Sequence, residues 1–200
     1  MRDAGSGAVF LDKDGTILDD VPYNVDPARM RLAPGAHAAL TILGSTRMPL
    51  IVVSNQAGVA HGRFAEAALQ PVELKLARLF ADRGARLAAF LYCPHHPDGS
   101  VPDYAVACDC RKPAAGMLQR AAAELKIDLA CSWMVGDILD DIEAGRRAGC
   151  TTILVDRGNE TEWRRSAVRE PHFSVAGIDE AARLISAHVR TRPALEARVG

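Results

Sequence analysis

The sequence has few aromatic residues, almost no net charge and no long apolar run. Aromatic side chains make up only 5% of the 200 residues, so the core must be built mainly from Ala, Leu, Val and Ile. The net charge is -1, from 24 basic and 25 acidic residues, and it lacks the basic excess expected of a general nucleic-acid-binding protein. No apolar run approaches the ~18 residues of a membrane span. We therefore expect neither nucleic acid nor a membrane as a partner.

The sequence also shows no export signal and no disulfide framework. The first apolar run, residues 8–11, ends at Asp12 and is shorter than the apolar segment of a signal peptide. The number of cysteines is odd, at five, and Cys131 and Cys150 both precede apolar runs and are expected in the core. These features predict a cytoplasmic protein with reduced thiols.

The length and composition predict one folded domain over residues 1–189, acting as a monomer. Residues 190–200 have no clear packing pattern and are expected to form a mobile tail. Apolar runs alternate with Ala- and Leu-rich segments, which predicts an α/β fold with a doubly wound parallel sheet. The predicted strands are 8–11, 50–53, 88–92, 132–135 and 151–155, and the predicted helices are 36–44, 65–83, 115–125, 140–148 and 179–188.

Two irregular stretches interrupt this alternation. Residues 19–34 are expected to form a flap or hairpin after the first strand, and residues 93–113 contain cysteines, histidines and several prolines. Neither stretch is long enough for a large cap domain, so any cover over the site must be small.

The strongest chemical signal is Asp12-Lys13-Asp14-Gly15-Thr16, at the end of the first predicted strand. The ends of parallel strands form the mouth of an open α/β sheet, where ligands bind. Residues two apart lie roughly 6–7 Å from each other, so Asp12 and Asp14 could flank a phosphorus atom or hold a divalent cation. The alternative is a solvated turn with capping aspartates.

Three weaker signals follow later strands. Ser54 could bind phosphate oxygens or cap a turn, and Lys112, next to Pro113, could neutralise a phosphoryl group or be an ordinary surface lysine. Asp137 follows the fourth strand and Asp141 lies one helical turn further. Their oxygens suit Mg²⁺, although helix capping would also explain them.

Taken together and in this order, the four segments resemble the motifs of the haloacid dehalogenase (HAD) superfamily over roughly residues 8–165. The resemblance implies that Asp12 is a nucleophile forming an aspartyl-phosphate and that Asp14 is the general acid and base. It also implies that Ser54 and Lys112 stabilise the phosphoryl group, and that Asp12, the carbonyl of Asp14 and Asp137 bind Mg²⁺. The electrostatics of phosphoryl transfer are consistent with these roles, because a carboxylate attacks an anionic phosphate only when the negative charge is neutralised.

A cluster of three cysteines and one histidine predicts a structural zinc site within residues 93–110. Cys93, His95, Cys108 and Cys110 form a Cys₃His set that suits tetrahedral Zn²⁺. His96 is the competing histidine ligand, and buried free cysteines are the alternative to a metal site. Because this segment ends beside Lys112, zinc would hold the loop that presents the lysine.

Within the superfamily, the segments Cys-Pro-His-His-Pro-Asp-Gly and Cys-Asp-Cys-Arg-Lys-Pro resemble the D-glycero-D-manno-heptose-1,7-bisphosphate 7-phosphatases. That resemblance implies a sugar bisphosphate as substrate, and histidinol phosphate is the main alternative. A second phosphate would need a cation, for which Arg111, Arg63 and Arg157 are candidates. By motif matching, the expected substrate contacts are Asp20, Tyr23, Asn55, Gln56 and Arg111.

Two alternative functions, from classes of protein other than enzymes, remain. A phosphorylatable receiver domain carries its acceptor aspartate after the third strand, but here that strand ends at Tyr92-Cys93. A zinc-dependent nucleic-acid-binding module would need a basic face, which the charge balance does not indicate.

Overall fold

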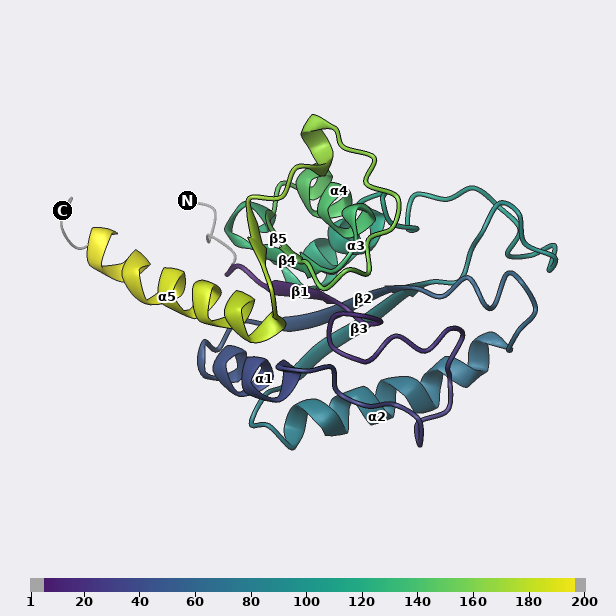
Figure 1. Cartoon of the computed structure of the whole chain (residues 1–200), viewed down its shortest axis with the longest axis horizontal. Coiled ribbons are helices and arrows are strands. Elements are labelled where there is room, and N and C mark those ends of the chain that lie inside the picture. Colours follow the sequence, from purple (N-terminus) through teal and green to yellow (C-terminus); the bar gives the residue numbers. More distant parts are fainter. Residues whose placement is uncertain (1–5, 197–200) are drawn as a thin grey trace.

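The computed structural model describes residues 6–196 and contains one six-stranded parallel sheet (Figure 1). The predicted α/β fold with a doubly wound parallel sheet is confirmed. The strand order is β3-β2-β1-β4-β5-β6. The strands are β1 (Val9–Asp12), β2 (Leu50–Asn55), β3 (Leu87–Cys93), β4 (Trp133–Gly136), β5 (Thr151–Val155) and β6 (Phe173–Val175).

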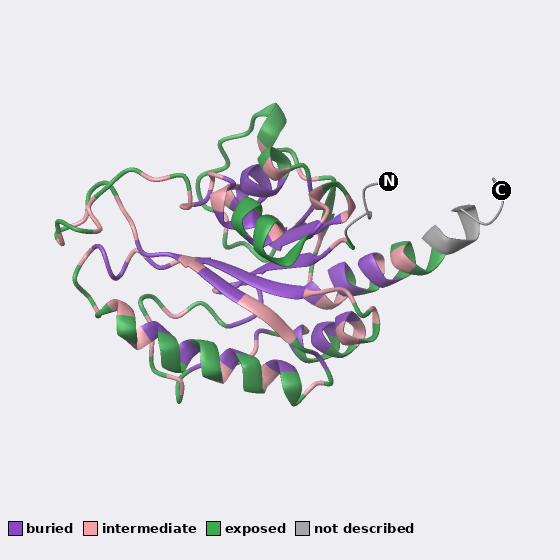
Figure 2. Ribbon diagram, turned by 180° about the vertical axis from the view of Figure 1, so that it is seen from behind, coloured by how far each residue is buried: buried purple, intermediate pink, exposed green. Residues whose placement is uncertain are grey.

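Helices cover both faces of the sheet, with α1, α2 and α5 on one side and α3 and α4 on the other (Figure 1). Alternate residues of the strands point to opposite faces. On β1, Leu11 therefore packs in the core under α1, α2 and α5, and Phe10 packs under α3 and α4. The central strands are buried throughout (Figure 2). The helices are α1 (Ala36–Ser45), α2 (Leu69–Ala81), α3 (Gly116–Leu125), α4 (Leu139–Ala148) and α5 (Ile178–Glu196).

The largest differences from the predicted elements concern β6, α2 and α5, and β2 also extends two residues further, to Asn55. Strand β6 was not predicted, because it has three residues and Phe173 and Ser174 are exposed. Helix α2 begins at Leu69, after a short 3₁₀ turn over Glu66–Ala68. Helix α5 continues past residue 189 to Glu196, so the first part of the predicted tail is helical. Residues 197–200 lie outside the described part of the chain.

The two irregular stretches lie at the same end of the sheet (Figure 1). The 19–34 flap is closed at its base, where Leu18 and Leu32 form an antiparallel bridge and the Asp19 N–H donates to the Arg31 carbonyl at 3.0 Å. Residues 94–115 connect β3 to α3 without a regular helix or strand. No described helix is long and apolar enough to cross a membrane.

The strand order places the switch point of the sheet between β1 and β4. At such a point the connections leave in opposite directions and open a crevice at the carboxyl ends of the strands. Asp12 ends β1 and Asp137 directly follows β4, so these two aspartates flank the crevice.

Candidate active site

Three buried carboxylates meet at the switch point. Asp12, Asp137 and Asp141 each offer an oxygen, and these oxygens all lie within 4.8 Å of one another. Asp141 comes from the first turn of α4, where one of its oxygens also accepts the Ile138 N–H at 3.3 Å. Carboxylate oxygens are the hard donors that Mg²⁺ prefers. A bound Mg²⁺ ion would also offset the repulsion between these three close negative charges.

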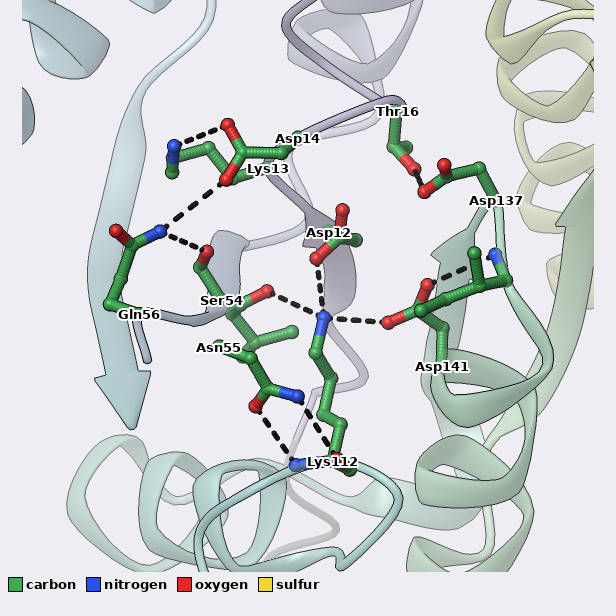
Figure 3. Close-up of polar contacts among 12 residues, drawn as sticks. Asp12, Lys13, Asp14, Thr16, Ser54, Asn55, Gln56, Lys112, Asp137 and Asp141 are labelled. Atoms are coloured by element: carbon green, nitrogen blue, oxygen red, sulfur yellow. Dashed lines mark hydrogen bonds and ion pairs between the residues drawn. The ribbon is translucent and has the colours of Figure 1, made fainter. Parts of the chain in front are cut away.

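Lys112 is the cation of this cluster (Figure 3). Its ammonium group forms ion pairs with Asp12 and, at 2.6 Å, with Asp141, and it donates to the Val53 carbonyl at 3.2 Å. Burial disfavours its charged form, but the two carboxylates outweigh burial and raise the pKa of Lys112. Lys112 therefore carries its charge beside Asp12.

The backbone of Lys112 is fixed by Asn55 at the end of β2. The Asn55 amide donates to the Lys112 carbonyl at 2.9 Å, and the Lys112 N–H donates back to the amide oxygen at 3.0 Å. This reciprocal pair connects the end of β2 to the loop before α3, although 57 residues separate the partners in sequence.

Asp137 is held through both of its carboxylate oxygens. The Thr16 hydroxyl donates to Oδ1 at 2.8 Å, and the Asn159 amide donates to Oδ2 at 2.8 Å. Burial, together with the nearby Asp12 charge, raises the pKa of Asp137 to about 6. A bound cation would favour the ionised form by neutralising the same charges.

Asp14 lies apart from the three carboxylates and faces Lys13 and Gln56. Its Oδ1 pairs with the Lys13 ammonium at 2.5 Å, and its Oδ2 accepts the Gln56 amide at 3.4 Å. Burial raises the pKa of Asp14 against the opposing effect of Lys13, and the charge of Asp12 adds to the increase. A raised pKa suits a carboxyl group that must donate a proton.

A cavity of about 220 Å³ opens over these groups. It brings together all four predicted catalytic side chains, the predicted metal ligand Asp137 and two of the predicted substrate contacts. It is lined by Asp12, Asp14, Asp20, Ser54, Asn55, Lys112, Asp137, Ile138 and Asn159.

The other three predicted substrate contacts lie outside this cavity. Gln56 is buried behind Ser54. Tyr23 is exposed on the flap, with the Arg63 guanidinium 5.7 Å from its ring centre. Arg111 lines a neighbouring cavity of about 490 Å³ that also touches Lys112, and its buried Nη1 has no hydrogen-bond partner among the described residues. Arg157 is exposed in the β5–β6 connection.

The sequence analysis missed two members of the site. Asp141 was noted as part of the fourth motif but left out of the predicted metal ligands, and the structure places its carboxylate with those of Asp12 and Asp137. Asn159 was not considered. It lies in the connection between β5 and β6, far from every motif, so no local pattern could have identified it.

The four predicted zinc ligands converge in the loop between β3 and α3. The three sulfur atoms lie 3.1 to 3.5 Å apart, and the His95 Nδ1 is 3.3 Å from the Cys110 sulfur and 3.6 Å from the Cys93 sulfur. Tetrahedral Zn²⁺ with bonds of about 2.3 Å to sulfur would separate two sulfurs by about 3.8 Å, so the donor set fits zinc after a small expansion. His96 instead accepts the Asp98 N–H at 3.2 Å and lies outside the set.

Comparison with known proteins agrees with this geometry. Residues 109–181 match the HAD-hydrolase-like family model. The D-glycero-beta-D-manno-heptose-1,7-bisphosphate 7-phosphatase of Escherichia coli (strain K12) is 42% identical over 152 residues, which are 76% of this chain and 80% of that protein. The enzyme of the same name from Photorhabdus laumondii is 41% identical over 166 residues, covering 82% of this chain and 88% of the relative.

A solved structure shares the fold. The D,D-heptose 1,7-bisphosphate phosphatase from B. bronchiseptica, complexed with magnesium and phosphate, superposes with a TM-score of 0.72 at 28% identity, over 92% of this chain and 99% of that one. The sheet order, the acidic cluster and these relatives agree. The chain is therefore a phosphatase and belongs to the D-glycero-beta-D-manno-heptose-1,7-bisphosphate 7-phosphatase family of HAD-like hydrolases.

Proposed function

We propose that this phosphatase removes the 7-phosphate of D-glycero-D-manno-heptose 1,7-bisphosphate through an aspartyl-phosphate on Asp12. The observation that carries the proposal is the placement of Asp12, which lies in the cavity with Lys112 paired to it and Asp14 and Ser54 at the same wall. The relatives' substrate, together with the neighbouring cavity beside Arg111, supports a sugar bisphosphate.

In the first step, a carboxylate oxygen of Asp12 attacks phosphorus, and the bond from phosphorus to the sugar oxygen breaks. The carboxyl proton of Asp14 moves to that oxygen, so the sugar leaves with a neutral hydroxyl group at position 7 and keeps its 1-phosphate. The Lys112 ammonium and the Ser54 hydroxyl bind the phosphoryl oxygens and offset the charge that opposes attack.

In the second step, a water molecule attacks the aspartyl-phosphate and transfers a proton to Asp14, which is now ionised. The bond between phosphorus and Asp12 breaks, inorganic phosphate is released, and both aspartates regain their starting states. The raised pKa of Asp14 suits both transfers, because the group must be protonated in one step and ionised in the next.

Two metals complete the proposal. Asp12, Asp137 and the carbonyl of Asp14 would hold Mg²⁺, with Asp141 as a further candidate ligand, and the ion would supply positive charge to the phosphoryl oxygens. Cys93, His95, Cys108 and Cys110 would hold Zn²⁺ and fix the loop that ends at Lys112.

The proposed substrate contacts extend from the cavity. Asp20 and Asn55 line it and can bind sugar hydroxyl groups. Tyr23, which pairs with Arg63, is proposed as a further contact from the flap. Arg111, which lines the neighbouring cavity beside Lys112, is the cation that suits the second phosphate.

We also propose that the enzyme acts as a monomer in the cytoplasm. A reducing compartment would keep the thiols of Cys93, Cys108 and Cys110 available for zinc.

A phosphate-release assay over a substrate panel tests this function. The panel contains heptose 1,7-bisphosphate, heptose 7-phosphate and histidinol phosphate, with excess Mg²⁺. We expect the highest kcat/KM for the bisphosphate, with only one phosphate released. An Arg111→Ala variant should lose more kcat/KM on the bisphosphate than on the monophosphate, by roughly 1–3 kcal/mol. A wild-type preference for histidinol phosphate would reject the proposal.

A further inference from the structure

Gln56 is a buried polar side chain that the proposed mechanism does not use. It is 6% exposed and does not line the catalytic cavity, although it lies directly behind Ser54. Its backbone is fixed on both sides, because its N–H donates to the Cys93 carbonyl at 2.8 Å and its carbonyl accepts the Val59 N–H at 3.2 Å. The side chain therefore starts from a backbone that is hydrogen-bonded at both its N–H and its carbonyl.

One nitrogen of Gln56 connects two catalytic groups (Figure 3). Its Nε2 donates to the Ser54 Oγ at 2.7 Å and to the Asp14 Oδ2 at 3.4 Å. In its ionised form Asp14 favours this orientation of the amide, because a carboxylate oxygen attracts the NH₂ group and repels the amide oxygen.

The orientation of the amide decides what the Ser54 hydroxyl can do. A hydroxyl group has one hydrogen to donate and two lone pairs to accept with. Since the Ser54 oxygen accepts from Gln56, its own hydrogen is left over. Within residues 6–196 that hydrogen is donated to no protein acceptor, and Ser54 lines the cavity.

We infer that Gln56 is a positioning residue, which directs the hydrogen of the Ser54 hydroxyl into the cavity, where it can be donated to the phosphoryl group. The same amide nitrogen of Gln56 also holds the Asp14 carboxyl group in place. This inference rests on the roles proposed for Ser54 and Asp14. It does not depend on which sugar carries the phosphate.

Gln56→Glu is the sharpest test, because it keeps the shape of the side chain and reverses the hydrogen bond. A carboxylate at residue 56 accepts the Ser54 hydrogen and removes it from the cavity. We expect the affinity for inorganic phosphate, measured by calorimetry in excess Mg²⁺, to fall about tenfold or more. The KM for p-nitrophenyl phosphate should rise in parallel. The melting temperature and zinc content should stay near the wild-type values.

A double-mutant cycle with Ser54→Ala separates this effect from the added charge. Without the hydroxyl, Gln56→Glu should cost clearly less phosphate affinity than it does with Ser54 present. Gln56→Leu, which adds no charge, should show a smaller loss that disappears in the Ser54→Ala background, and it serves as the test variant if the glutamate variant does not fold.

Equal losses of phosphate affinity in the two backgrounds would overturn the inference, as would a fall in kcat with unchanged KM and phosphate affinity. Because the probes are inorganic phosphate and p-nitrophenyl phosphate, a different natural sugar substrate would reject the proposed function and leave this test intact.

Discussion

At the scale of single residues, the site depends on how charge is balanced around Asp12. Its carboxylate is buried beside Asp137 and Asp141, and the Lys112 ammonium pairs with Asp12 and Asp141. The arrangement leaves Asp12 with a neutralising partner before substrate arrives, which a nucleophile toward an anionic phosphate requires.

Asp12→Asn should therefore remove activity without removing the fold. The amide keeps the shape of the side chain but is a poor nucleophile, so kcat should fall at least ~10³-fold. Far-UV circular dichroism and the melting temperature should remain close to wild type. Asp82→Asn, on the exposed end of α2, is the matched control and should keep full activity. A kcat within tenfold of wild type for Asp12→Asn would remove Asp12 from the nucleophile role.

Asn159 should increase the Mg²⁺ affinity of the proposed site by orienting the Asp137 carboxylate. In Asn159→Ala, the Oδ2 of Asp137 loses the donor that orients it, and such supporting hydrogen bonds typically change metal affinity 10–100-fold. We expect the Mg²⁺ concentration for half-maximal activity to rise about tenfold, with kcat at saturating Mg²⁺ within about threefold of wild type. Calorimetric titration with Mg²⁺ should show the same loss of affinity.

The control for that variant is Asn24→Ala in the flap, where within residues 6–196 the Asn24 side chain hydrogen-bonds only to the backbone of Asp26. It should leave Mg²⁺ affinity unchanged. If Asn159→Ala binds Mg²⁺ as tightly as Asn24→Ala does, Asn159 has no part in holding the metal site.

At the scale of elements, the loop between β3 and α3 connects two sites. Cys93 ends β3, Cys108 and Cys110 follow in the loop, and Lys112 comes two residues later. A metal bound to the Cys₃His cluster would thus restrict the segment that carries Lys112 into the catalytic cavity.

The neighbouring histidines of this loop provide a matched pair of variants. His95→Ala removes a donor of the Cys₃His cluster, so zinc content and melting temperature should fall together, because zinc binding contributes directly to folding. His96→Ala should keep both near wild type, since His96 lies outside the cluster. Metal analysis and thermal melts of the two purified variants show which of the two histidines is the zinc ligand. Zinc loss in His96→Ala but not in His95→Ala would reverse the assignment.

The elements also show which parts of a fold a sequence pattern can predict. Strand β5 contains the buried apolar run Ile153-Leu154-Val155 and was predicted at its observed bounds, Thr151–Val155. Strand β6 has no such run, because Phe173 and Ser174 are exposed at the edge of the sheet. Helix α5 continues past the predicted end at residue 188, because no glycine interrupts residues 178–196, and the helix runs through Pro193.

At the scale of the whole molecule, the two proposed metal sites differ in their donor atoms and in their access to solvent. The carboxylates belong to an open cavity that must admit substrate, whereas the cysteines and His95 form a closed set of four donors. Open oxygen sites exchange Mg²⁺ readily, and closed Cys₃His sites hold Zn²⁺ tightly.

Brief treatment with EDTA should therefore separate the two metals. Activity should vanish, and Mg²⁺ alone should restore it, because zinc stays bound. Metal analysis after gel filtration should find zinc near one equivalent and no magnesium. Recovery that requires added Zn²⁺ would contradict the proposed division of roles between the two sites.

The sequence by itself determined the α/β fold, the positions of Asp12, Ser54 and Asp137 at or next to strand ends, and the donor sets of the two proposed metal sites. These features depend on local patterns: apolar runs, residues directly after a strand, and donor chemistry within a short segment. Each can be recognised without knowing how distant segments pack.

Only the tertiary structure decided how these groups are combined. It placed Asp141 with the other two carboxylates, chose His95 over His96, added Asn159 from the β5–β6 connection and put Gln56 behind Ser54. The physical reason is that a hydrogen bond or metal contact depends on distances of a few ångström. Between residues on different strands, those distances are set by the packing of the whole sheet and its connections, and no local pattern records them.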